Sequence, residues 1–262
     1  MKKNQKRILL FLLVVTLVIA CSTLLKNNQS SQESNSINNR NTTYSFQKFL
    51  PTANNKTYHH TYYSLSYNEQ HEQADWVYYL LTKEYVNGTA KRKNNFRADD
   101  LIITKSASLQ DYKKSGYDRG HLCAAADMKI NDKAMSETFF MSNMSPQIPG
   151  FNRGEWKKLE AKVRDWAIQE DSILVVTGPV FKDNIKQIGE NQVTVPGYYY
   201  KVIYDLTKPQ KMTAFIMPHQ AKPQPFMNYQ TTVNEVEKIT GIDFFSILED
   251  EFEEQLEANQ HW

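Results

Sequence analysis

The chain has 262 residues, which is enough for one large domain or two small ones. Its 40% hydrophobic and 12% aromatic residues support a substantial core. The formal net charge is +2, but four Lys and Arg lie in the first seven residues. Without these four residues, the chain has 27 basic and 29 acidic residues. The net charge therefore gives no argument for nucleic-acid binding.

The N-terminus predicts a bacterial export signal, because the cationic segment 1–7 precedes the almost entirely apolar segment 8–20. This segment of 13 residues falls short of the roughly 20 that a membrane-spanning helix needs. Val18-Ile19-Ala20-Cys21 resembles a bacterial lipobox, which predicts cleavage before Cys21 and lipidation of that residue. The alternatives are an uncleaved anchor and an ordinary signal with an unrelated cysteine. Each alternative places the bulk of the protein outside the cytoplasm.

Cys123 is the other cysteine, and lipidation of Cys21 leaves it without an intramolecular disulfide partner. It lies two residues after His121, where its thiol could act as a nucleophile. The flanking Ala124-Ala125-Ala126 favours the alternative, a small buried residue in a tightly packed segment.

Segment 26–55 is rich in Asn, Ser and Gln and predicts a flexible tether. The sequence therefore divides into a lipoprotein signal peptide at 1–20, a tether at 21–55 and one domain at 56–262.

Within the domain, apolar residues at helical spacing predict a helix over 74–86. Extended or irregular segments around a hairpin are predicted at 96–104 and 117–126. A short helix is predicted at 136–141, followed by a loop with two prolines at 142–151. An amphipathic helix is predicted at 155–169, and a helix at 233–240 is ended by Gly241. Strands are predicted at 172–180, 198–204 and 212–217. This order lacks a βαβ rhythm, so we expect a single α+β domain.

The run Asp118-Arg119-Gly120-His121 combines a cation, a flexible joint and a potential base. Arg119 can bind a phosphate in a bidentate fork, Gly120 allows a backbone turn, and His121 can deprotonate a water. Hydrolysis of a phosphodiester also needs charge neutralisation, which a divalent metal with few protein ligands can supply.

Candidate metal-binding residues follow 31 residues after His121. Asn152 offers a carbonyl oxygen at the expected start of a helix. Glu160 lies about two turns further, a rise of ~12 Å, which suits a carboxylate that holds a metal-bound water. Arg164, one more turn along, can pair with Glu160 and with phosphate.

Each residue taken singly has a structural alternative. An Asn before a helix is often an N-cap, and a Glu-Arg pair at i,i+4 is often a surface pair. Segment 91–129 has nine Lys and Arg against five Asp, which also fits a solvated surface. We expect no catalytic role for the remaining histidines, His59, His60, His71, His219 and His261.

The combination carries more information. Asp118-Arg119-Gly120-His121, then Met141-Ser142-Asn143 with Ser145-Pro146-Gln147, then Asn152, Trp156, Leu159 and Glu160 resembles the DNA/RNA non-specific endonuclease family of the ββα-metal (His-Me finger) superfamily, in an endonuclease G-like, bacterial lipoprotein form. The resemblance runs from about Tyr63 to Phe245. Further matching segments are 92–100, 177–181, 195–202 and 236–241.

This resemblance implies a central antiparallel sheet flanked by helices and a sugar-non-specific endonuclease that cuts DNA and RNA with Mg²⁺ or Mn²⁺, leaving 5′-phosphates. It makes His121 the general base, Asn152 the direct metal ligand and Glu160 a ligand through water. The remaining implied roles are phosphate contacts for Arg119 and Arg92, support of Glu160 by Arg164, orientation of nearby groups by Asn143, and positioning of the loop by Asp118. Arg97 is the alternative to Arg92.

Two other functions stay in view. One is a catalytically silent nucleic-acid-binding lipoprotein of the same fold. The presence of all four chemical groups argues against it: His121, Asn152, Glu160 and Arg119. The other is a toxin-type nuclease that needs an inhibitor partner. We expect an extracytoplasmic protein held to a membrane by lipid at Cys21, either periplasmic or at the cell surface. The sequence leaves open a homodimer and the biological purpose.

Overall fold

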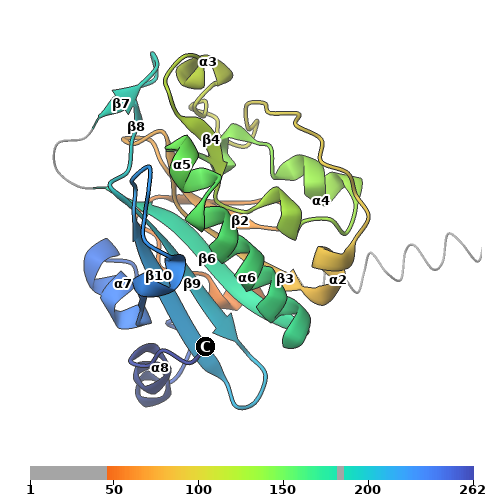
Figure 1. Cartoon of the computed structure of the whole chain (residues 1–262), viewed down its shortest axis with the longest axis vertical. Coiled ribbons are helices and arrows are strands. Elements are labelled where there is room, and N and C mark those ends of the chain that lie inside the picture. The colour runs from red at the N-terminus through yellow and green to blue at the C-terminus, as the bar shows by residue number, and fades with distance from the viewer. Residues whose placement is uncertain (1–45, 182–185) are drawn as a thin grey trace, which may run out of the picture. The chain divides into compact units, whose positions relative to one another are not determined.

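The computed structural model describes residues 46–181 and 186–262, and residues Phe49–Trp262 form a compact unit (Figure 1). The expected signal peptide and Cys21 lie outside the described residues. Among the helices of the described part, none is both long and apolar enough to cross a membrane.

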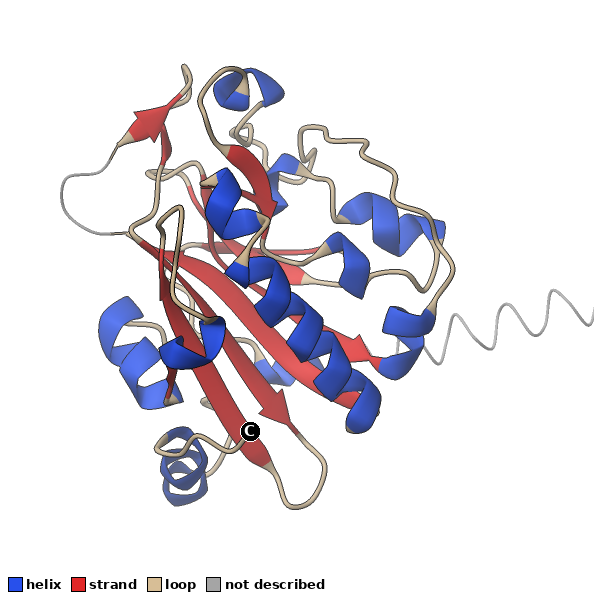
Figure 2. Cartoon of the chain, in the orientation of Figure 1, coloured by secondary structure: helices blue, strands red, loops and turns tan. Residues whose placement is uncertain are grey.

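A seven-stranded antiparallel sheet forms the centre of the compact unit (Figure 2). Its order is β1-β2-β3-β6-β9-β10-β11. The central strands are buried on both faces, apart from their first residues. The strands span Lys56–His59 (β1), Ser64–Asn68 (β2), Gln73–Thr82 (β3), Ser172–Val180 (β6), Tyr198–Asp205 (β9), Lys211–Pro218 (β10) and Gln230–Thr231 (β11). The expected α+β fold with a central antiparallel sheet is confirmed.

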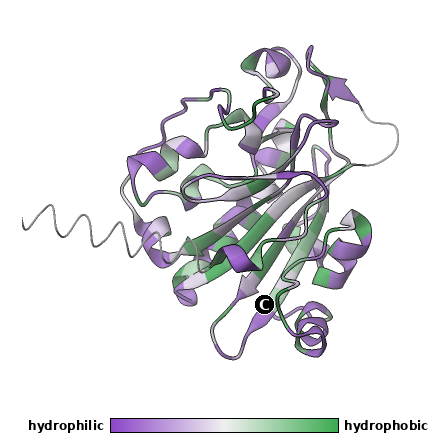
Figure 3. Ribbon diagram, turned by 180° about the vertical axis from the view of Figure 1, so that it is seen from behind, coloured by the Kyte–Doolittle hydropathy of each residue, from purple (hydrophilic) through white to green (hydrophobic). Residues whose placement is uncertain are grey.

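Helices cover both faces of this sheet. Helix α6 (Glu155–Gln169) packs on β3 and β6, and its Trp156 contacts Tyr199 of β9. The next residue of that strand, Tyr200, points to the opposite face and contacts Phe244, which follows helix α7 (Val233–Thr240). Helix α8 (Asp250–Glu257) packs beside α7 and β10. Seen from behind, the sheet is largely hydrophobic while α8 is mostly hydrophilic (Figure 3).

Shorter elements complete the compact unit. Strands β4 (Asp118–His121) and β5 (Met144–Gln147) pair antiparallel in a second sheet, and β7 (Gln187–Ile188) pairs with β8 (Val193–Thr194). The short helices are α2 (Lys83–Asn87), α3 (Leu109–Tyr112), α4 (Asp132–Glu137) and α5 (Pro149–Asn152), with 3-10 turns η1 (Gln47–Phe49), η2 (Ala125–Asp127), η3 (Met141–Asn143) and η4 (Phe226–Tyr229).

The helix expected over 74–86 is wrong. Residues 73–82 form strand β3, and only 83–87 are helical, with the Thr82 hydroxyl capping the Tyr85 N–H at 3.1 Å. Because β3 lies between β2 and β6 and is buried on both faces, its apolar residues do not alternate. The spacing of a doubly buried strand was thus taken for that of a helix.

Other expectations hold more closely. Helix α6 and strand β6 have the expected bounds, and Gly241 ends α7 with a φ of +69°. The loop expected at 142–151 contains β5 and α5, and the helix expected at 136–141 lies earlier, at α4. The compact unit begins before the expected tether ends, since Thr52 exchanges backbone and hydroxyl hydrogen bonds with Asp243.

Candidate active site

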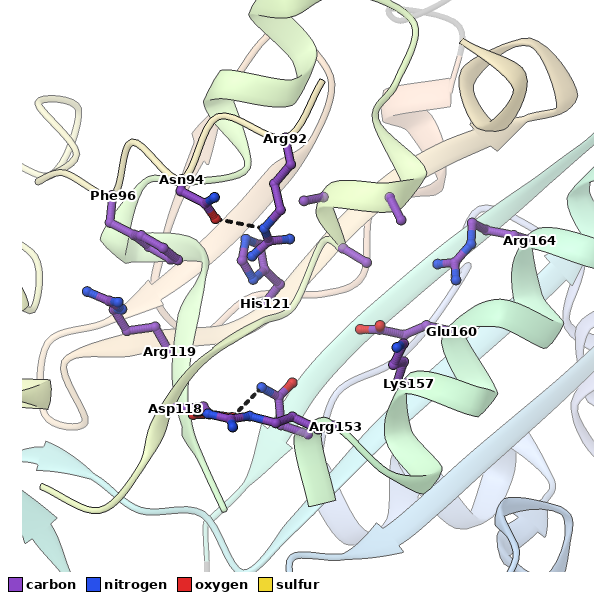
Figure 4. Close-up of a pocket in the computed structure, with 14 residues that line it drawn as sticks. Arg92, Asn94, Phe96, Asp118, Arg119, His121, Arg153, Lys157, Glu160 and Arg164 are labelled. Carbon is purple, nitrogen blue, oxygen red and sulfur yellow. Dashed lines mark hydrogen bonds and ion pairs between the residues drawn. The ribbon is translucent and has the colours of Figure 1, made fainter. Parts of the chain in front are cut away.

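A pocket of about 590 Å³ opens between β4, the end of α5 and the face of α6 (Figure 4). It brings together the candidate site residues that the sequence singled out, apart from Asn143, while Cys21 lies outside the described residues. Its lining comprises Arg92, Asn94, Phe96, Asp118, Arg119, His121, Ala124, Ala125, Ala126, Asn152, Arg153, Lys157, Glu160 and Arg164.

Gly120 allows β4 and β5 to pair beside the pocket. A Cβ at this position would come within 2.2 Å of the Gln147 side chain, so a larger residue would force that side chain to move. The two residues that flank Gly120 in β4 differ in burial: Arg119 is exposed to solvent, whereas His121 is only 9% exposed.

The His121 imidazole is enclosed by aromatic rings. Its ring meets Phe139 edge-on at 5.1 Å and lies 5.8 Å from Phe96. Nε2 is buried and has no hydrogen-bond partner among the described residues. Burial, and then the charges of Arg92 and Arg119, lower the pKa of His121 to about 3. The ring is therefore neutral near pH 7, so one of its nitrogens carries a free lone pair.

Two arginines flank His121 and stack on the rings that enclose it. The Arg119 guanidinium lies 4.1 Å from the centre of the Phe96 ring, and that of Arg92 lies 4.9 Å from Phe139. Arg92 Nε also donates to Asn94 Oδ1 at 2.7 Å. The alternative residue, Arg97, stacks on Phe140 and does not line the pocket. The structure therefore favours Arg92 as the second cation of the site.

Asn152 is the last residue of α5, rather than the start of the following helix as expected. Residues Arg153 and Gly154 separate α5 from α6, and a Cβ at Gly154 would come within 2.3 Å of the Gly150 carbonyl oxygen. The side chain of Asn152 donates through Nδ2 to Asp118 at 2.9 Å. Among the described residues, its Oδ1 has no hydrogen-bond donor, which leaves this oxygen available to a ligand.

Asp118 holds the end of α5. Besides the bond from Asn152, its carboxylate accepts two hydrogen bonds from Arg153, one from Nε at 2.8 Å. Burial acts in the opposite direction, but these hydrogen bonds lower the pKa of Asp118. With both oxygens occupied as acceptors, Asp118 acts on the position of its neighbours.

Glu160 lines the far side of the pocket from His121, together with Lys157 and Arg164 (Figure 4). In the described part of the chain its carboxylate has no hydrogen bond or ion pair. Burial raises the pKa of Glu160 to about 7, with a further contribution from Asp127 and opposing ones from Lys201 and the arginines. A cation bound in the pocket would stabilise the ionised form of the Glu160 carboxylate.

Arg164 was expected to pair with Glu160, but its ion pair is with Asp127, at 2.9 Å. Asp127 is 1% exposed and also accepts a hydrogen bond from Tyr79 at 2.8 Å. Sequence reasoning gave Asp127 no role. Its one signal is being the acid that ends the alanine-rich segment after His121.

Asn143 lies behind the pocket and fixes the backbone just after His121. It is fully buried, accepts from the Cys123 N–H at 2.8 Å, and donates to the carbonyl oxygens of Cys123 and Thr138. Cys123 is also fully buried, and burial raises the pKa of its thiol. It matches the small buried residue expected rather than a nucleophile.

The pocket's donor set fits a hard divalent cation. The described residues contain no cluster of three or more His, Cys, Asp or Glu able to hold a metal. They do offer the free Asn152 Oδ1 and the unpartnered Glu160 carboxylate on one pocket. Mg²⁺ prefers such oxygen ligands and usually keeps several waters, so few protein ligands suffice.

The sequence profile of the family described as DNA/RNA non-specific endonuclease matches residues 29–251. The chain belongs to this family. It is 33% identical to human mitochondrial endonuclease G over 198 residues, covering 70% of this chain and 67% of that protein. It is 30% identical to the mitochondrial nuclease EXOG of Mus musculus over 219 residues, covering 76% and 60%. Nuclease C1 of Cunninghamella echinulata is 35% identical over 205 residues, covering 71% and 81%.

A solved structure of an EndoG/EndoGI complex matches this family member with a TM-score of 0.72 and 33% identity. The match covers 78% of this chain and 91% of that one, and it supports the ββα-metal nuclease fold. Here β4 and α6 contribute residues to the pocket lining, and β5 pairs with β4. The chain spans only 57 to 66% of the length of the nuclease EXOG sequences of mouse and human and of the Syncephalastrum racemosum nuclease.

Proposed function

We propose that this chain is a metal-dependent, sugar-non-specific endonuclease that hydrolyses phosphodiester bonds of DNA and RNA. The observation that carries the proposal is one pocket shared by a neutral, enclosed histidine, two stacked arginines, and an amide oxygen and a carboxylate that accept no hydrogen bond from any described residue.

His121 accepts the proton of the attacking water, and Arg119 and Arg92 bind the phosphate. Asn152, directly, and Glu160, through water, would hold a Mg²⁺ or Mn²⁺ ion, which neutralises the phosphoryl oxygens and stabilises the leaving oxygen. Asp118 keeps Asn152 in place, and Asp127 holds Arg164 at the side of Glu160. Cleavage without sequence preference follows from contacts to phosphates rather than to base edges.

Plasmid DNA and RNA, each incubated with the purified chain in Mg²⁺, Mn²⁺ or EDTA, test this function. We expect internal cleavage of both polymers with either metal and none in EDTA. Cutting that persists in EDTA would contradict the metal requirement. Binding without any cleavage would instead support the silent nucleic-acid-binding alternative.

We also propose that lipid at Cys21 anchors the enzyme outside the cytoplasm, on the basis of the sequence Val18-Ile19-Ala20-Cys21. Growth with a labelled fatty acid should mark the wild-type protein but not Cys21→Ser. Equal labelling of the two would refute lipidation at this residue. Light scattering of the lipid-free chain tests the homodimer, which has about twice the mass of the chain.

A further inference from the structure

His219 follows strand β10 and lies against the turn that leads into α5. Its Nε2 accepts the backbone N–H of Ile148 at 2.7 Å, and its Nδ1 is 2.8 Å from the Pro196 carbonyl oxygen. Because an amide N–H only donates and a carbonyl only accepts, the ring is neutral with its proton on Nδ1. Burial lowers the pKa of His219, which agrees with the neutral form.

The bond to Ile148 connects His219 to Asn152. Ile148 is the N-cap residue of α5, and its carbonyl oxygen accepts the backbone N–H of Asn152 at 2.9 Å. The His219 ring also meets Phe151, the residue before Asn152, edge-on at 5.3 Å. A continuous path of contacts thus runs from β10 to the proposed metal ligand.

Helix α5 needs such support from outside. It has only four residues, and in the described part of the chain no side chain caps its first turn. One turn of helix is unstable by itself, because nucleation fixes several residues for a single hydrogen bond. At its other end, the bond between Asn152 and Asp118 holds the side chain. The two attachments together fix the backbone and the amide of Asn152.

We propose that His219 is a positioning residue of the nuclease, which holds the start of α5 so that the Asn152 side chain stays directed at the metal. This inference rests on the proposed function. It assigns a task to a histidine that has no contact with the pocket itself, since His219 is not among the lining residues.

Two substitutions separate the two contributions of the ring. His219→Phe keeps a ring against Phe151 but can neither accept from Ile148 nor donate to Pro196. His219→Gln loses the ring, yet its amide can do both. His71→Leu is the matched control, because His71 is also part-buried, hydrogen bonded to Thr194 and stacked on Phe181 at 3.8 Å, without a bond to α5.

The first readout is Mn²⁺ binding to the protein without nucleic acid, followed by electron paramagnetic resonance. We expect His219→Phe to weaken Mn²⁺ binding by ~10-fold or more, the usual scale for residues that orient a metal ligand. His219→Gln and His71→Leu should bind within about threefold of wild type, as expected when the orienting bonds persist. If the phenyl ring prevents folding, His219→Leu replaces it with the same expectation.

Cleavage kinetics supply the second readout. His219→Phe should lower kcat with a nearly unchanged KM for DNA, and His219→Gln should restore kcat. Wild-type Mn²⁺ affinity in a less stable His219→Phe would overturn the inference, as would a His219→Gln variant as impaired as His219→Phe. Failure of the wild type itself to bind Mn²⁺ or cut would instead reject the proposed function.

Discussion

The Asn152 side chain donates a 2.9 Å hydrogen bond to the Asp118 carboxylate, joining the strand that carries His121 to the residue proposed to bind the metal. Asp118, the first residue of the Asp118–His121 run, thus positions Asn152 at the end of α5. This hydrogen bond links the strand of the proposed base, His121, to the proposed metal ligand, Asn152, although the two residues lie 31 positions apart in the chain.

Removing this bond should affect the metal requirement. In Asp118→Ala, the Asn152 amide can rotate, so we expect the Mg²⁺ concentration for half-maximal cleavage to rise by about 10-fold. Asp118→Asn keeps an acceptor oxygen and should lie between this variant and wild type. Titration of cleavage with Mg²⁺ measures the effect. An unchanged requirement in Asp118→Ala would show that Asn152 is held without this bond.

Arg119 should contribute binding of the phosphate backbone. Arg119→Ala is expected to raise KM for DNA by about 10-fold, because the loss of a charge-assisted hydrogen bond removes about 1.5 kcal/mol of binding free energy. It should also reduce the dependence of log Kd on log salt by about one unit. Arg97→Ala is the control, because that guanidinium stacks on Phe140 outside the pocket lining. Equal effects of the two substitutions would refute a specific role for Arg119.

Cys123 should be chemically inert in the folded protein. Its side chain is fully buried and its thiol pKa is raised, so iodoacetamide should label it in urea but not in native buffer. Cys123→Ala should keep wild-type cleavage. Rapid labelling of the native protein together with loss of activity in Cys123→Ala would point to the nucleophile that the structure argues against.

The acidic cluster between α7 and α8 should make stability fall at alkaline pH. Burial and the nearby Glu237 and Glu253 raise the pKa of Glu257 to about 9, so the folded state holds a proton that the unfolded chain releases near 4.5. The contribution of Glu257 to stability is thus full below pH 4.5 and decreases as the pH rises towards 9.

Glu257→Gln should remove this penalty. At pH 8 we expect its thermal midpoint to exceed that of wild type by about 2–4 °C, the shift that about 1 kcal/mol gives in a domain of this size. The difference should shrink at pH 5. Glu251→Gln, an exposed acid of the same helix, should change little at either pH. A gain for Glu257→Gln that is equal at both values would exclude the cluster as the cause.

The parts of the fold with a clear local signal could be predicted. Helix α6 shows one apolar face and β6 is a short continuous apolar run, so both have the bounds that the sequence indicated. Strand β3 is buried on both faces and lost its period of two. Helix α8 carries three acids in its first turn, where the helix dipole favours them, and Glu249 caps it.

The site was predictable where a residue's own chemistry defines it. Type and spacing pointed to His121, Arg119 and Glu160, and all three line one pocket. Their partners depend on contacts between distant segments, which spacing does not encode. Arg164 meets Asp127 across 37 residues, and His219 meets Ile148 across 71.

Single-turnover cleavage by His121→Ala tests the central claim most directly. With saturating Mg²⁺ and enzyme in excess over a short DNA duplex, the variant should cut at least ~10²-fold more slowly than wild type, the typical loss of a general base. Its affinity for the duplex should be nearly unchanged, and His59→Ala, outside the pocket lining, should cut as wild type does. Cleavage by His121→Ala at the wild-type rate would contradict the account.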